Sequence, residues 1–260
     1  MKSPGAPGVE RVTMRHSLLR TALLPLALLT AAPALASPFS WLGGTKGNGQ
    51  LKTEERKLPA FQKVDLRTSV DVVITEGSTP STRVTVDGNL QPLLTTKVEG
   101  DTLVISTEGN GIDESRGSKV ELVMPALAAV NIHGSGDVKV QRSSPADALE
   151  LGVEGSGDLT YRGSAKSLTV HINGSGDVTL EGGKAERLEA GIHGSGDLKA
   201  RGLSARDASV AIHGSGDAAI TADGGTLAFE IHGSGDVTWY GEGKVERTSI
   251  HGSGDVTHRQ

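Results

Sequence analysis

The chain has no cysteine among its 260 residues. Disulfides, thiol chemistry and a lipid-bearing cysteine are therefore excluded. Only 3% of the residues are aromatic, which is few for a large globular core but enough for a thin stack of strands filled by valine, isoleucine and leucine. The chain also has no basic excess, since its formal net charge is −5, so a nucleic-acid partner is not expected.

Long apolar runs are also missing, apart from a short one near the N-terminus. Residues 1–36 have the pattern of a secretory signal peptide whose true start we place at Met14. The apolar run at residues 21–32 is too short to span a bilayer, and a small-residue cleavage site ends at Ala36. We therefore expect an exported protein without a transmembrane segment in its mature chain, located in the periplasm, at the cell surface or secreted.

What the chain does have is a repeat in its second half. The tetrapeptide Gly-Ser-Gly-Asp occurs seven times, and its aspartates are 19 to 21 residues apart. The copies end at Asp137, Asp158, Asp177, Asp197, Asp217, Asp236 and Asp255. Self-similarity at a nearly fixed period of about 20 residues is typical of stacked repeat architectures.

The residues around each tetrapeptide alternate between apolar and polar. If the first glycine is position 0, positions −4, −2, +4 and +6 are mostly apolar, and the positions between them are mostly polar or small. This period of two on both sides of a fixed glycine corner indicates strand, corner, strand. The sequence therefore predicts an all-β fold, a right-handed parallel β-helix with coils of about 20 residues and Gly-Ser-Gly corners. We expect the four apolar columns to be buried and positions −1 and +3 to be exposed.

The first half of the chain is less regular. Residues 66–74 have the same alternation of apolar and polar residues as the repeats, with Asp71 in the aspartate position, so they are interpreted as a degenerate coil. Residues 97–106 have the pattern of two strands joined by a tight turn. The expected organisation is a signal peptide at 1–36, a linker at 37–57, N-terminal coils and a cap at 58–128, and a seven-repeat β-solenoid at 129–260.

Three features resemble a known bacterial family, the putative auto-transporter adhesin head GIN domain. They are Leu-Pro-Ala-Phe at residues 58–61, Val-Met-Pro-Ala-Leu at residues 123–127, and the Gly-Ser-Gly turns. The resemblance extends from about residue 56 to the C-terminus. It implies an exported right-handed β-helix with a role in cell adhesion, possible trimers, and no established catalytic residues to transfer.

Two polar columns are candidates for a binding site. Position −1 is His133, Glu154, Asn173, His193, His213, His232 and His251, and position +3 is aspartate in all seven repeats. One interpretation is structural: the histidines are solvated surface residues, and each aspartate accepts a backbone N–H at its corner. The alternative is a metal site on the two columns. Its ligands would come from His193, His213, His232, His251, Asp197, Asp217, Asp236 and Asp255.

Repetition also argues against a catalytic triad, because a triad needs one buried and oriented set of residues. We therefore predict a non-enzymatic binding or adhesion module of the bacterial cell envelope, with no cofactor. Expected partners are further copies of the chain, joined at an uncapped last coil, and a cell-surface glycan or an envelope protein. Two alternatives stay open: a carbohydrate-active enzyme on a β-helix, and a passive metal-binding or structural envelope protein.

Overall fold

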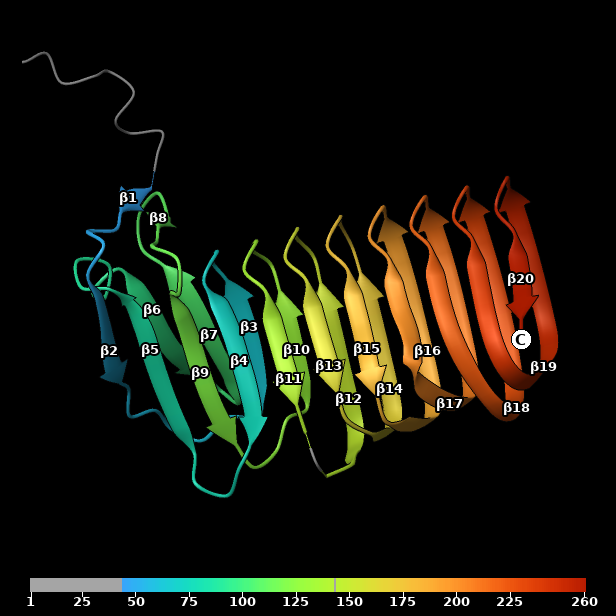
Figure 1. Ribbon diagram of the computed structural model, residues 1–260, viewed down its shortest axis with the longest axis horizontal. Helices are drawn as coiled ribbons and strands as arrows, with labels where there is room; N and C mark the ends of the chain where they lie inside the picture. Colours follow the sequence, from blue (N-terminus) through green and yellow to red (C-terminus); the bar gives the residue numbers. More distant parts are fainter. Residues whose placement is uncertain (1–43, 143) are drawn as a thin grey trace, which may run out of the picture. The chain divides into compact units, whose positions relative to one another are not determined.

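The computed structural model describes residues 44–142 and 144–260 as a β-solenoid of stacked parallel coils (Figure 1). The expected all-β fold is confirmed: the described residues contain strands, turns and loops and no helix. None of them therefore forms a helix able to cross a membrane. The predicted signal peptide lies outside the described residues.

Each coil is built from two strands and two corners. The strands of the first half are β1 (Thr45–Lys46), β2 (Leu51–Glu55), β3 (Lys63–Arg67), β4 (Asp71–Glu76), β5 (Ser81–Asp87), β6 (Leu94–Glu99), β7 (Thr102–Thr107), β8 (Ile112–Asp113) and β9 (Lys119–Met124). Those of the repeats are β10 (Ala129–Ile132), β11 (Val138–Gln141), β12 (Ala146–Val153), β13 (Leu159–Arg162), β14 (Ala165–Ile172), β15 (Val178–Gly182), β16 (Lys184–Gly194), β17 (Leu198–Gly214), β18 (Ala218–Gly233), β19 (Val237–Gly252) and β20 (Val256–Arg259).

Equivalent positions of successive repeats lie side by side, as the period predicts. On one face β10, β12, β14 and β16 pair in parallel, and on the other face β11, β13 and β15 do so. Val130 pairs with Leu151, and Val138 pairs with Leu159. From β17 onwards single long strands pass through the variable corner, so one strand contributes to both faces.

The core runs along the inside of the coils. The columns at −4, −2, +4 and +6 are buried in the first six repeats, and Ile192, Ile212 and Ile231 have no exposed surface. In the seventh repeat Ile250 is 39% exposed and Val256 is only partly buried, since no described coil packs over them. The predicted buried columns are thus confirmed except at the last coil. The positions predicted to be exposed are so except for Asp177, Asp197 and His232, which are half-buried.

The corners require glycine because the backbones of neighbouring coils approach closely there. A Cβ on Gly214 would lie 2.2 Å from the carbonyl oxygen of Gly194, and a Cβ on Gly196 would lie 2.2 Å from that of Gly176. Gly214 also has a φ of +146°, which residues with a side chain rarely adopt. The repeated glycines therefore allow the coils to stack at the corner.

The first half of the chain supplies the N-terminal coils in an order that differs from the sequence. The coil of β3 and β4 lies between the coil of β7 and β9 on one side and that of β10 and β11 on the other. Asp71 occupies the aspartate position of this coil, as its parity predicts, because the N–H of Asp137 donates to its carboxylate. The predicted strand pair at 97–106 is the antiparallel pair β6–β7.

The described part of residues 37–57 differs from the linker that we expected. It contains β1, which pairs with β8, and β2, which lies antiparallel to β5. Asp87, at the end of β5, is fully buried and accepts hydrogen bonds from the backbone N–H groups of Gly49 (2.6 Å) and Ser115 (2.8 Å). These bonds hold the segment before β2 against the loop that follows β8, and the backbone N–H of Ser115 is the main reason why the pKa of Asp87 is lowered.

Candidate functional site

The clearest surface feature is a column of four stacked imidazoles at position −1. The ring centroids of neighbouring histidines are 4.8 to 4.9 Å apart, and the first two pairs are nearly parallel, with interplanar angles of 4° and 7°. The column, here called the His column, consists of His193, His213, His232 and His251. Its rings are exposed or half-buried, and their spacing matches the ~4.8 Å between paired strands, so the backbone sets it.

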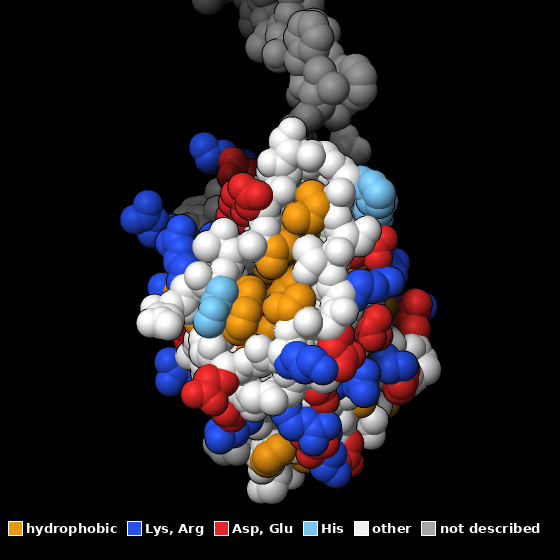
Figure 2. All heavy atoms as spheres, turned by 90° about the vertical axis from the view of Figure 1, so that its right-hand side faces the viewer, with side chains coloured by type: hydrophobic (Ala, Val, Ile, Leu, Met, Phe, Trp, Pro, Cys, Tyr) orange, Lys and Arg blue, Asp and Glu red, His pale blue; other side chains and the backbone are white. Residues whose placement is uncertain are grey.

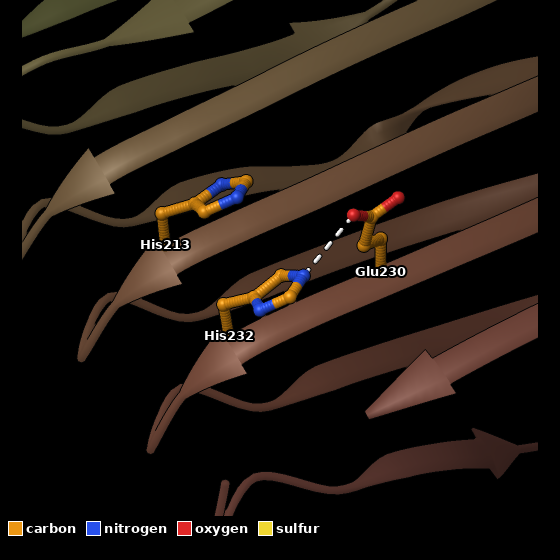
Figure 3. Close-up of side chains that lie close together, drawn as sticks. All are labelled: His213, Glu230 and His232. Atoms are coloured by element: carbon orange, nitrogen blue, oxygen red, sulfur yellow. Dashed lines mark hydrogen bonds and ion pairs between the residues drawn. The ribbon is translucent and has the colours of Figure 1, made fainter. Parts of the chain in front are cut away.

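A carboxylate lies beside this column. Glu230 precedes His232 by two residues on β18, so both side chains point to the same face. Its Oε1 lies 3.1 Å from Nε2 of His232 (Figure 3). Its Oε2 lies 3.3 Å from Nη2 of Arg247. One ligand atom each from His213, Glu230 and His232 lie within 4.8 Å of one another, and no other group of three or more such side chains meets this criterion among the described residues.

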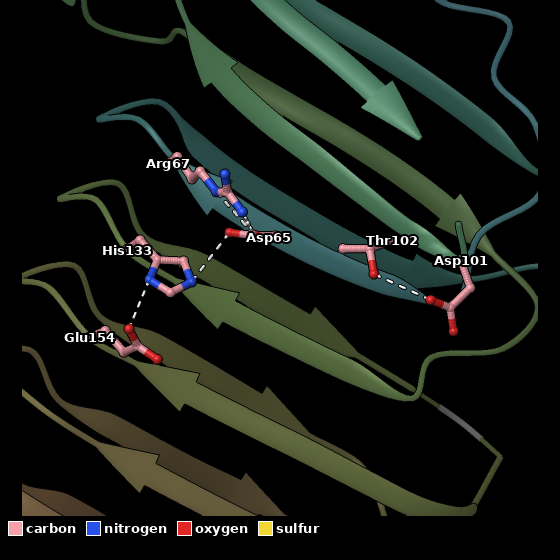
Figure 4. A network of polar contacts seen from close by, with 6 residues as sticks. All are labelled: Asp65, Arg67, Asp101, Thr102, His133 and Glu154. Atoms are coloured by element: carbon pink, nitrogen blue, oxygen red, sulfur yellow. Dashed lines mark hydrogen bonds and ion pairs between the residues drawn. The ribbon is translucent and has the colours of Figure 1, made fainter. Parts of the chain in front are cut away.

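In the first repeats, position −1 has different neighbours from those of the His column. Nδ1 of His133 lies 3.0 Å from Glu154, and its Nε2 lies 3.5 Å from Asp65 (Figure 4). Asp65 also accepts a hydrogen bond of 3.1 Å from Nε of Arg67. This imidazole is therefore enclosed by two carboxylates that belong to the coils before and after it, which makes a network of polar contacts between coils.

The aspartate column links each coil to the next. The backbone N–H of every repeat aspartate donates to Oδ1 of the aspartate one coil earlier, at 2.8 to 3.0 Å. We call this series the Asp ladder. It runs from Asp71 through Asp137, Asp158, Asp177, Asp197, Asp217 and Asp236 to the N–H of Asp255. The carboxylates accept backbone N–H groups as the structural interpretation expects, but the bonds join neighbouring coils and do not close single corners.

One member of the ladder has a perturbed pKa. Burial raises the pKa of Asp177, but hydrogen bonds from Lys199 and from the backbone N–H of Asp197 outweigh it and lower the pKa overall. Lys199 lies directly against the free oxygen of this carboxylate. The carboxylate of Asp177 is therefore held in its ionised form by donors of the protein itself.

The histidines and the aspartates of the predicted metal site thus have different contacts. Asp197, Asp217 and Asp236 each give one oxygen to the ladder, and the close group on the His column contains none of them. Glu230 takes the place of an aspartate in that group. The repeat pattern could not reveal Glu230, because the same position in neighbouring repeats is Ala211 and Ser249, so the position carries no periodic signal.

Two hollows lie away from the His column. One of about 500 Å³ is lined by side chains of both charges, among them Glu76, Lys139, Arg142 and Arg162. The other, of about 420 Å³, is mostly apolar and is formed by residues 55–62, 80–82 and 123–126. It contains residues 58–61 and the first four residues of the stretch 123–127, on which the family resemblance partly rests, so these motifs lie together in space.

A family model and several solved structures match this chain. A family model described as "Putative auto-transporter adhesin, head GIN domain" matches residues 60–243. A search of curated proteins gives no match. Among solved structures, a putative adhesin from Bacteroides fragilis is 22% identical and superimposes with a TM-score of 0.76, covering 83% of this chain and 100% of its own.

Two further structures come from Parabacteroides. A putative adhesin from Parabacteroides merdae is 22% identical, with a TM-score of 0.65, and covers 84% of this chain and 99% of its own. A putative lipid binding protein from Parabacteroides distasonis is 25% identical, with a TM-score of 0.67, and covers 84% of this chain and 100% of its own. Both share the solenoid fold with this chain.

Proposed function

This chain belongs to the putative auto-transporter adhesin head GIN domain family, as its motifs indicated, and we propose that it is an exported, non-enzymatic adhesion module of the bacterial envelope. The family description and the adhesin structures that share its fold support this function. Export to the cell surface or its surroundings follows from the same role, because an adhesin must reach its partner.

The observation that carries the proposal is the repetition of exposed polar groups along the corners. The serine of every Gly-Ser-Gly-Asp corner is exposed, so hydroxyl groups recur once per coil along one edge of the solenoid. We call this edge the corner ridge. It consists of Ser135, Ser156, Ser175, Ser195, Ser215, Ser234 and Ser253.

Such a surface suits a partner that is itself extended and repetitive. Solenoids use their elongated surfaces for binding, and many weak contacts along one ligand add up to useful affinity. A cell-surface polysaccharide offers hydroxyl groups at regular intervals, and serine hydroxyls can both donate and accept hydrogen bonds to them. The proposed partner is therefore a glycan chain that lies along the corner ridge.

The open end of the last coil supports self-association as a further part of the proposal. Hydrophobic side chains run down the middle of the end formed by β19 and β20 (Figure 2). Val245 and Ile250 are each 39% exposed there, and the outer edge of this coil has no described strand beside it. An apolar patch bordered by unpaired strand edges is the kind of surface that proteins normally cover, and a second copy of the chain would cover it.

A glycan array with the purified protein tests the adhesion proposal. We expect binding to a subset of polymeric glycans and weaker binding by the triple variant Ser195→Ala, Ser215→Ala, Ser234→Ala. Ser209→Ala is the matched control, because Ser209 is exposed on a sheet face and not at the corner. Absence of binding to any glycan, or equal loss in the control, would contradict a glycan partner and direct the search to envelope proteins.

A further inference from the structure

The group of His213, Glu230 and His232 has the geometry of an incomplete metal site. A tetrahedral zinc ion has bonds of about 2.0–2.2 Å to imidazole nitrogen and carboxylate oxygen, so its ligand atoms lie a little over 3 Å apart. Nε2 of His232 and Oε1 of Glu230 are already 3.1 Å apart. The third ligand atom, from His213, lies within 4.8 Å of both.

The remaining movement is small and falls on an accessible ring. The ring of His213 is exposed, and its centroid lies 4.8 and 4.9 Å from those of its two neighbours in the column. A rotation of this imidazole about its side-chain bonds can therefore bring a ring nitrogen closer to Glu230 without moving the strands. Figure 3 shows both rings on neighbouring strands with the carboxylate on the same face.

The carboxylate is also oriented by a group outside the site. Arg247 lies 3.3 Å from Oε2 of Glu230, whereas His232 contacts Oε1. Ligands of metal ions are commonly positioned by such outer partners, which restrict their rotation. Because Arg247 holds one oxygen, the other is directed to the His column.

We propose that His213, Glu230 and His232 bind a divalent transition metal ion such as Zn²⁺. Two imidazoles and one carboxylate suit zinc, nickel and copper, whereas calcium prefers oxygen ligands only. Three protein ligands leave at least one position to water on this exposed face. The inference rests on side-chain geometry and does not depend on the proposed adhesion function.

Calorimetry with Zn²⁺, Ni²⁺ and Ca²⁺ on protein without an affinity tag tests the site. We expect one zinc ion per chain at micromolar affinity, similar or stronger binding of nickel, and no measurable calcium binding. His213→Gln, His232→Gln and Glu230→Gln should each weaken zinc binding by about ten-fold or more. Thermal melts of the metal-free variants establish that they are folded as the parent is.

His193→Gln is the matched control. His193 belongs to the same stacked column, but the residue two positions before it is Gly191, which has no side chain to bind a metal. This variant should keep the zinc affinity of the parent. The proposal is overturned if zinc does not bind at micromolar concentration, if Glu230→Gln leaves the affinity unchanged, or if His193→Gln weakens it as much as His213→Gln does.

Discussion

The backbone N–H of Asp217 donates a hydrogen bond of 2.9 Å to Oδ1 of Asp197, one coil earlier. The same bond recurs from Asp71 to Asp255, so a side chain conserved in every corner of this chain serves to join neighbouring coils. The backbone carbonyl of each aspartate is used as well: that of Asp217 accepts the N–H of Leu198 at 2.8 Å. Each corner aspartate is thus bonded to the preceding coil through its backbone N–H and C=O, and to the following coil through its side chain, as Asp217 is to Asp236.

Removing one carboxylate from the ladder should therefore destabilise the solenoid. Asp197→Ala leaves the N–H of Asp217 without its acceptor, and we expect a loss of about 1–3 kcal/mol in the free energy of unfolding. Asp197→Asn keeps an oxygen acceptor and should cost clearly less. Urea unfolding of both variants measures the difference, and equal losses would mean that the hydrogen bond contributes nothing.

The glycine corners give a prediction in which steric contact and backbone strain can be separated. Gly214→Ala combines a Cβ contact of 2.2 Å with a φ of +146°, and we expect a loss of roughly 2–5 kcal/mol. Gly224→Ala has a φ of +87° but no atom within 4 Å, and it should cost about 1 kcal/mol or somewhat more.

Gly182→Ala is the matched control for both changes. A Cβ there meets nothing within 4 Å, and its backbone is not in the left-handed region, so we expect a change within about 0.5 kcal/mol. Thermal or urea unfolding ranks the three variants. A Gly214→Ala variant as stable as Gly182→Ala would show that the coils can separate at the corner at little cost.

The lowered pKa of Asp207 should make part of the protein's stability depend on pH in the acid range. The backbone N–H of Thr226 is the main cause that lowers the pKa of Asp207, to about 2, and Arg206 contributes a further hydrogen bond. A folded pKa below the unfolded value of about 3.9 stabilises the fold above pH 4, and this contribution is lost as the pH falls towards 2. Unfolding by urea between pH 2 and 5 should depend less steeply on pH in Asp207→Asn than in the parent, and identical slopes would contradict it.

The hydrogen bonds of Asp87 should hold the segment around β2 against the rest of the protein. Because its buried carboxylate accepts N–H groups from Gly49 and Ser115, Asp87→Ala should release the segment around β2 while leaving the repeats intact. Hydrogen exchange should show faster exchange in residues 45–55 and unchanged protection in β14 and β16. Unchanged exchange in residues 45–55 would mean that the pairing of β2 with β5 suffices to hold this segment.

The sequence predicts the structure of the repeats well because each coil has the same local pattern of apolar, polar and glycine residues. Alternation around the corner places Ile192 and Ile212 inside and His193 and His213 outside, and the structure confirms both. The aspartate position could be recognised even in the degenerate coil, since Asp71 keeps the parity of the repeats.

What the sequence could not predict depends on contacts between distant segments or on positions that do not repeat. The placement of β3 between β7 and β10 is set by pairing across the chain, and nothing local distinguishes it. The glycine- and charge-rich composition of residues 37–57 predicts a linker, and β2 gives no contrary signal, because all five of its residues are exposed and it lacks the alternation of a half-buried strand. Glu230 was missed because its position varies from coil to coil.

Binding of the labelled protein to intact bacterial and host cells tests the adhesion function most directly. We expect saturable binding that free polysaccharide competes away. The triple variant Ser195→Ala, Ser215→Ala, Ser234→Ala should bind several-fold more weakly, and Ser209→Ala should bind as the parent does. Binding that does not saturate, or that is the same for the parent and the corner-ridge variant, would contradict an adhesin that acts through its repeated corners.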